Sequence, residues 1–225
     1  MMGKLIHWLG IFAFCLPLWA LAFIGTASGR ESGGIIKEAT PEEIQAFFKE
    51  KKMTVLTFLG YSGAEYENKA SMLEQAVKIL AQFEPKSTIV NIGATPQGIG
   101  AVYDLAKARG FMTTGIVSTQ AKEKQAGLSP NVDMVFYVKD DTWGGFLPGT
   151  QHLSPTSKVL VENSDVIVAI GGGEVARDEL LAARQLGKRL KFSPADMNHR
   201  IAREQALKQS QPAPTSFGGA AGTIF

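Results

Sequence analysis

Stretches of apolar residues alternate along the chain with patterns typical of amphipathic helices. Five apolar, β-rich stretches predict buried strands, at residues 53–59, 88–92, 111–117, 132–138 and 165–170. A sixth stretch, residues 189–192, is short and polar, which favours a strand at the edge of the sheet. Apolar positions at helical spacing predict helices starting near residues 40, 72, 102, 156, 174 and 195. This alternation predicts an α/β fold, a Rossmann-like, doubly wound parallel sheet with helices on both faces.

Glycine-rich turns follow several of the predicted strands. They occupy residues 60–63, 93–100 and 171–173, and a long irregular stretch at 139–155 follows the fourth strand. In a parallel sheet these connections meet at the carboxyl edge, where open α/β sheets bind ligands. The candidate ligand-binding residues in the three turns are Gly60, Ser62, Gly98, Gly100, Gly171, Gly172 and Gly173.

The third turn joins the most apolar strand to a helix and has the strongest pattern. Three glycines can adopt positive φ and admit a ligand to the backbone. The following helix start offers N–H groups and a positive dipole end, which suit a phosphate. The alternative is a tight packing turn that binds nothing. In the long stretch, Trp143 is a further ligand-binding candidate, with the alternative that its indole fixes the loop to the core.

Composition narrows the classes of function. A length of 225 residues with 45% hydrophobic content indicates one α/β domain with short appendages. A net charge of +2, without basic runs interleaved with aromatic residues, argues against nucleic-acid binding. Cys15, the single cysteine, lies in the N-terminal apolar segment, and the histidines lack partners at metal-ligand spacing. We therefore expect no metal site and no cofactor.

The N-terminus resembles a secretory signal peptide. A short basic start precedes an apolar stretch, and Ala20 and Ala22 suit a cleavage site after residue 22. The alternative is an uncleaved membrane anchor reaching about residue 27. Either case predicts an exported domain, periplasmic or secreted, or held at a membrane by the uncleaved segment. The predicted organisation is a signal peptide at 1–22, a linker at 23–34, the domain at 35–209 and a flexible tail at 210–225.

Residues 53–192 resemble the Lonely Guy (LOG) family of the SLOG superfamily, once described as lysine decarboxylase-like. Residues 171–179 are similar to the family signature Gly-Gly-Gly-x-Gly-Thr-x-x-Glu, and 98–102 are similar to its upstream glycine turn. The resemblance implies a nucleotide-binding Rossmann-like domain, a nucleotide or ribose-phosphate-like ligand, and a homodimer. Enzymes of the family release the base from nucleoside 5'-monophosphates. By this resemblance Glu179 is the candidate catalytic carboxylate, which stabilises the ribosyl cation or positions water, and Lys158 is the candidate cation. The alternative for Glu179 is an acidic residue that suits the start of a helix.

The signature departs from the family pattern where it normally holds phosphate. Val175 replaces the last glycine, Ala176 replaces the threonine, and Glu174 adds a negative charge. Lys158 stands without the arginine that accompanies it in the family. We therefore expect a domain that binds a nucleotide or sugar phosphate without efficient turnover. The alternatives are a phosphoribohydrolase that uses Glu179, and an envelope interaction module that retains only the fold.

Overall fold

The computed structural model describes residues 34–225, so the predicted signal peptide, the alternative anchor and most of the predicted linker lie outside the described residues. The strands are β1 (Ile35–Glu38), β2 (Thr54–Gly60), β3 (Thr88–Ile92), β4 (Met112–Ser118), β5 (Met134–Val138), β6 (Val166–Ile170) and β7 (Arg189–Ser193). The α-helices are α1 (Pro41–Lys51), α2 (Lys69–Leu80), α3 (Val102–Ala108), α4 (Thr119–Glu123), α5 (Pro155–Glu162), α6 (Glu174–Gln185) and α7 (His199–Lys208). Short 3-10 helices are η1 (Pro85–Ser87), η2 (Gly98–Ala101) and η3 (Ala220–Ile224).

The strands of the described residues form one parallel sheet in the order β1-β5-β4-β3-β2-β6-β7. From β2 the chain first builds outward through β3, β4 and β5, and then crosses back to place β6 and β7 on the other side. The direction of winding therefore reverses between β2 and β6, which is the switch point where such sheets bind ligands. This arrangement confirms the predicted Rossmann-like α/β fold and the edge position of β7.

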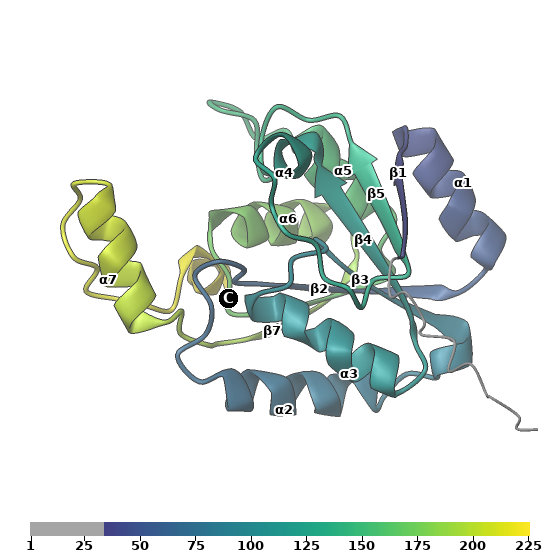
Figure 1. Ribbon diagram of the computed structural model, residues 1–225, viewed down its shortest axis with the longest axis horizontal. Coiled ribbons are helices and arrows are strands. Elements are labelled where there is room, and N and C mark those ends of the chain that lie inside the picture. The colour runs from purple at the N-terminus through teal and green to yellow at the C-terminus, as the bar shows by residue number, and fades with distance from the viewer. Residues whose placement is uncertain (1–33) are drawn as a thin grey trace, which may run out of the picture. The chain divides into compact units, whose positions relative to one another are not determined.

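Helices cover both faces of the sheet (Figure 1). One buried apolar cluster joins the sheet to α2, α3 and α4, and a second joins it to α1, α5 and α6. Because β2, β3 and β6 are buried on both faces, their sequences are nearly continuous apolar runs. Helix α7 extends away from the sheet at the left of Figure 1, and of its side chains only Ala202 is buried.

Buried polar side chains connect the central strands. Thr57 of β2 hydrogen-bonds to Ser164 at 2.6 Å and accepts a hydrogen bond from Asn91 of β3 at 3.2 Å. Thr114 of β4 in turn donates to Asn91 at 3.0 Å. Each member of this chain is paired, as buried polar groups must be to avoid a desolvation penalty, and the pairs are specific to this strand register.

Two regions differ from the sequence-based expectations. Residues 35–38 form edge strand β1, which was not predicted because all of its side chains are exposed and give no burial pattern. Part of the predicted flexible tail forms η3, whose Ala221 is fully buried against the α6 side of the sheet. The predicted flexible tail is therefore wrong for residues 220–224: their small side chains, which resemble a disordered composition, allow this segment to pack closely on the core.

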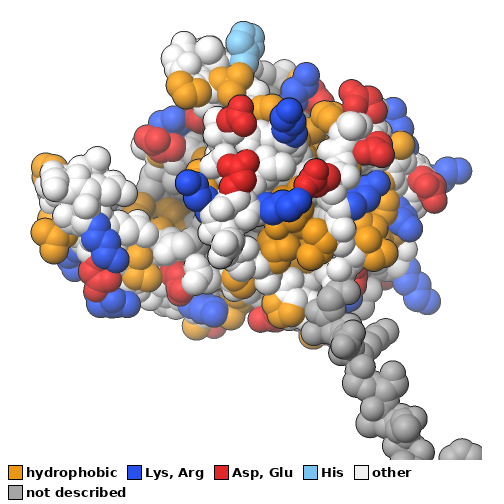
Figure 2. All heavy atoms as spheres, turned by 45° about the horizontal axis from the view of Figure 1, so that its top comes forward, with side chains coloured by type: hydrophobic (Ala, Val, Ile, Leu, Met, Phe, Trp, Pro, Cys, Tyr) orange, Lys and Arg blue, Asp and Glu red, His pale blue; other side chains and the backbone are white. Residues whose placement is uncertain are grey.

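The surface carries mixed charge. Acidic and basic side chains are interspersed over the face in Figure 2, without a continuous basic stripe. Within residues 34–225, no helix has the length and apolar character needed to cross a membrane.

Candidate functional site

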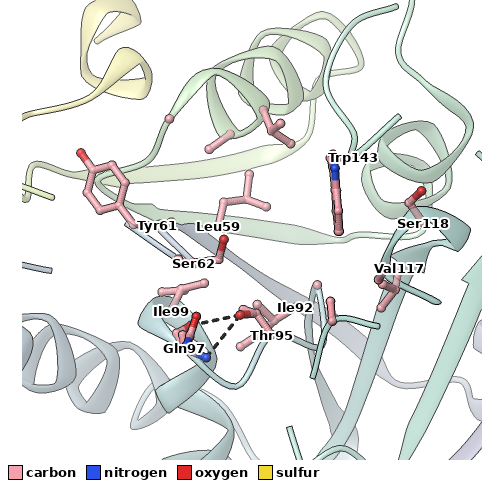
Figure 3. A pocket seen from close by; sticks show the side chains of 18 of the residues that line it. Leu59, Tyr61, Ser62, Ile92, Thr95, Gln97, Ile99, Val117, Ser118 and Trp143 are labelled. Atoms are coloured by element: carbon pink, nitrogen blue, oxygen red, sulfur yellow. Dashed lines mark hydrogen bonds between the residues drawn. The ribbon is translucent and has the colours of Figure 1, made fainter. Parts of the chain in front are cut away.

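A pocket of about 880 Å³ opens at the carboxyl edge of the sheet, at the switch point between β2 and β6. Its walls come from the turns after β2, β3 and β6, the end of β4, and the long loop after β5. Figure 3 shows Ser62, Thr95 and Gln97 together on one side and Ser118 on the other. Between them lie apolar side chains, so the pocket combines an apolar interior with a few polar groups, as small-molecule sites do.

The start of α6 forms one wall of the pocket. Gly173 is the N-cap of this helix, no side chain caps it, and Glu174, Val175 and Ala176 also line the pocket. The first backbone N–H groups of a helix have no partner within it, so this wall offers donors and a positive dipole end. Glu174 adds a carboxylate beside these donors.

The other two glycines of this turn serve packing instead. Gly171 has φ +57, and a Cβ there would lie 2.6 Å from the Tyr61 ring. Gly172 has φ +135, and a Cβ there would lie 2.7 Å from the Ala176 Cβ. Gly173 differs, because a Cβ there would meet nothing within 4 Å. Of the three predicted glycines, only Gly173 lines the pocket.

The glycines of the two other turns also allow close approach of the backbone. Gly98 has φ +58, and a Cβ there would lie 2.1 Å from the Tyr61 carbonyl oxygen. A Cβ at Gly100 would lie 1.8 Å from the Thr95 carbonyl oxygen, so neither glycine could be replaced without moving the turn. Gly98 and Gly100 support the wall without lining it, whereas Gly60 and Ser62 are part of it.

Glu179 lies on the α6 wall and is 5% exposed. Its Oε1 accepts a hydrogen bond of 2.6 Å from the Ser157 hydroxyl of α5. Ser157 Oγ itself accepts a 2.7 Å hydrogen bond from the backbone N–H of Gly145. Burial raises the pKa of Glu179 to about 7; the Ser157 hydrogen bond opposes this rise, and the nearby Asp178 adds to it. Near neutral pH this carboxyl group can therefore donate or accept a proton within the pocket.

The long loop after β5 is anchored to the starts of α5 and α6. Asp140 Oδ2 accepts from the Thr156 N–H at 2.8 Å, and Asp178 Oδ2 accepts from the Phe146 N–H at 2.8 Å. Burial by itself would raise the pKa of Asp140. Hydrogen bonds from the backbone N–H groups of Thr156 and Thr142 outweigh the effect of burial, so the pKa is lowered. Trp143, between these anchors, lines the pocket.

Lys158 lies outside the pocket. Its side chain is 62% exposed and its ammonium lies 3.9 Å from a carboxylate oxygen of Glu162, one turn along α5. The side chain of Arg177 is bound to Asp178 at 2.8 Å. Among the described residues, no lysine or arginine is part of the pocket wall. The structure thus does not bring the predicted cation to Glu179.

The sequence patterns did not identify several residues of the site. Tyr61 packs under the turns and donates a hydrogen bond to the Ala195 carbonyl at 3.0 Å. Thr95 and Gln97 hydrogen-bond to each other within the second glycine turn, where polar residues between glycines were an available signal. Ser157 is not part of the pocket wall but binds Glu179, and it gave no signal in the sequence because only the packing of α5 against α6 brings the two together. Within residues 34–225, no group of three or more metal-ligating side chains comes together.

Parts of the chain are similar to known protein structures. No family model matches the chain, and no curated protein does. The chain is similar to the solved structure of TM1055, with 26% identity, a TM-score of 0.43, and coverage of 61% of this chain and 72% of that one. It is also similar to two structures of the molybdenum cofactor (Moco) carrier protein from Chlamydomonas reinhardtii. These have 19% and 16% identity, TM-scores of 0.46 and 0.44, and coverage of 62% and 70% of this chain and 76% and 85% of those.

Proposed function

We propose that the protein binds a small nucleotide or sugar phosphate in the switch-point pocket and does not turn it over efficiently. The observation that carries this proposal is the pocket itself, which joins three glycine-rich or polar turns to the uncapped start of α6. Its volume of about 880 Å³ is in the range of sites for small ligands and cofactors. The α6 wall can bind a phosphate through backbone N–H groups.

The composition of the wall supports weak or absent turnover. Cleavage of a glycosidic bond develops charge that positioned cations and hydrogen-bond donors must stabilise. In the described part of the chain, the pocket wall contains the carboxyl groups of Glu174 and Glu179 and no basic side chain. The cation predicted for this role, Lys158, faces away on the exposed surface of α5. Binding is thus the better supported function.

Calorimetric titration of the full chain with AMP, GMP and ribose 5-phosphate tests the binding proposal. We expect saturable binding of at least one of them, weakened when Val175 is replaced by Asp, which adds negative charge to the α6 wall. The control is Leu186→Asp, which adds the same charge at an exposed position at the other end of the same helix and should bind as the wild type does. Failure of all three ligands to bind would overturn the proposal.

One observation favours the phosphoribohydrolase alternative: Glu179 lies in the pocket wall with its pKa raised to about 7. A carboxyl group near neutrality suits proton transfer. Release of free adenine from AMP by the wild type, lost in Glu179→Gln, would establish this alternative and overturn binding without turnover.

We also propose that the protein is exported, because residues 1–22 have the pattern of a signal peptide. Mass spectrometry of the mature protein would show an N-terminus at Phe23 if cleavage follows Ala22. An intact N-terminus in a membrane fraction would indicate the anchor instead. The homodimer implied by the family resemblance stays a prediction, which light scattering of the purified protein would test.

A further inference from the structure

Trp143 is one of two aromatic residues in the described part of the chain, with Phe225, that are more than half exposed. Its indole is 56% exposed, whereas Tyr61, Tyr66 and Tyr103 are buried. An indole in water forgoes the large stabilisation that burial provides. Figure 3 shows Trp143 extending into the pocket, with Leu59 on one side of the ring and Val117 and Ser118 on the other. The largest exposed aromatic surface near the site therefore projects into the cavity.

The loop does not need this indole to hold its position. Polar anchors lie on both sides of Trp143: Asp140 binds the N–H of Thr156, and the N–H groups of Gly145 and Phe146 bind side chains of α5 and α6. All three hydrogen bonds are 2.7 to 2.8 Å long. The alternative that Trp143 fixes the loop to the core is thus disfavoured, because an anchoring indole would be buried.

The backbone beside Trp143 is also fixed. Gly144 has φ +116, and a Cβ there would lie 2.9 Å from Ser157 Oγ and 3.0 Å from a methyl group of Val175. Only glycine lets the loop approach α5 and α6 this closely. The segment that bears the indole is therefore held in place before a ligand binds. A ligand that contacts the indole would lose little of its binding free energy to ordering the loop.

We propose that Trp143 is the platform on which a planar heteroaromatic ring of the ligand stacks. This inference rests on the proposed function and defines the ligand class further: a compound with a base-like ring, in preference to a bare sugar phosphate. Stacking involves the face of the ligand's ring and does not depend on the hydrogen-bonding groups at its edge. The platform therefore favours planar rings in general and discriminates little among bases. Apolar neighbours such as Leu59 and Val117 suit the same ring.

The test compares AMP with ribose 5-phosphate, which lacks the base, by calorimetry on the full chain. We expect the wild type to bind AMP at least about tenfold more tightly than ribose 5-phosphate. Trp143→Ala should lose most of that preference and leave ribose 5-phosphate binding unchanged, and Trp143→Phe should keep part of it. Leu186→Ala, which removes an equally exposed apolar side chain at the far end of α6, is the control and should bind as the wild type does.

A second readout is fluorescence. In a W8F/W19F variant Trp143 is the single tryptophan, and we expect AMP, not ribose 5-phosphate, to quench its emission. Wild-type affinity for AMP in Trp143→Ala would overturn the platform and leave the proposed function standing. Equal weakening of both ligands would also overturn it, since the indole would then not act on the ring. If neither ligand nor GMP binds the wild type, the proposed function fails, and the platform with it.

Discussion

The backbone N–H of Ala221 donates a hydrogen bond of 3.0 Å to the carbonyl of Gly172, so the end of the chain is fixed to the glycine turn after β6. Ala221 is fully buried, and Phe225 stacks on Phe192 of β7 with ring centroids 4.8 Å apart. The guanidinium of Arg184 donates to the carbonyl of Ile224 at 2.9 Å. The C-terminal segment is thus part of the layer that supports the pocket wall.

Replacing Gly172 by alanine should destabilise the fold. The new Cβ would lie 2.7 Å from the Cβ of Ala176 and 3.2 Å from that of Ala221, at a backbone φ of +135 that L-residues rarely adopt. We expect a loss of about 2 kcal/mol or more in the free energy of unfolding, measured by urea denaturation. Gly173→Ala is the matched control, because a Cβ there meets nothing within 4 Å, and it should cost less than about 1 kcal/mol. Equal losses in both variants would contradict the packing role of Gly172.

Ala221→Asp should destabilise the protein through the C-terminal segment. A carboxylate at this fully buried position must be desolvated or expelled with η3. We expect a loss of about 3 kcal/mol and a lower Tm. The control is Thr223→Asp, on the exposed side of the same helix, which should change stability by less than about 0.5 kcal/mol. If Ala221→Asp lowers the stability no more than Thr223→Asp does, the segment does not contribute to the folded core.

Glu179 should make stability fall as pH rises. Its folded-state pKa is raised from 4.5 to about 7, so between these values the folded protein holds a proton that the unfolded chain has lost. Stability relative to Glu179→Gln is thus expected to decline from pH 4.5 to 7, by about 3 kcal/mol in all, and then to level off. Urea denaturation of both proteins across this range measures the difference. A difference that grows with pH would contradict the raised pKa.

Removing the Ser157 hydroxyl should raise the pKa of Glu179 further. The hydrogen bond from Ser157 to Oε1 favours the ionised carboxylate and opposes the effect of burial. In Ser157→Ala the titration midpoint of Glu179, followed by carboxyl-carbon NMR, is expected to move to higher pH. The variant also leaves the Gly145 N–H without its acceptor, so stability should fall by about 1–3 kcal/mol. Ser62→Ala, in the turn after β2, should leave the midpoint unchanged.

Lys158→Ala should affect neither stability nor ligand binding. The side chain is 62% exposed and its contact with Glu162, at 3.9 Å, is long and open to solvent. Exposed pairs of this kind contribute at most about 0.5 kcal/mol within a helix. Calorimetry with AMP should give the wild-type affinity. A tenfold loss would show that Lys158 reaches the ligand and would restore the role that the family resemblance assigns to it.

The sequence by itself determined the parallel α/β architecture and the edge on which the site lies. Apolar runs such as 166–170 are too short for typical helices and favour strands buried on both faces, and right-handed crossovers then bring their glycine turns to one edge. The polar composition of residues 189–192 likewise predicted an edge strand, which the structure shows as β7. These features depend on the pattern of apolar and polar residues within each short segment, which can be read directly from the sequence.

Only the tertiary structure decided which residues of those turns reach the pocket. Gly171 and Gly172 look like Gly173 in sequence, yet Tyr61, Ala176 and Ala221 occupy the space beside the first two. Likewise Glu179 gains its raised pKa from burial, and Lys158 is turned to solvent by the face of α5 on which it lies. Such properties arise from neighbours far apart in the chain, so no local pattern encodes them.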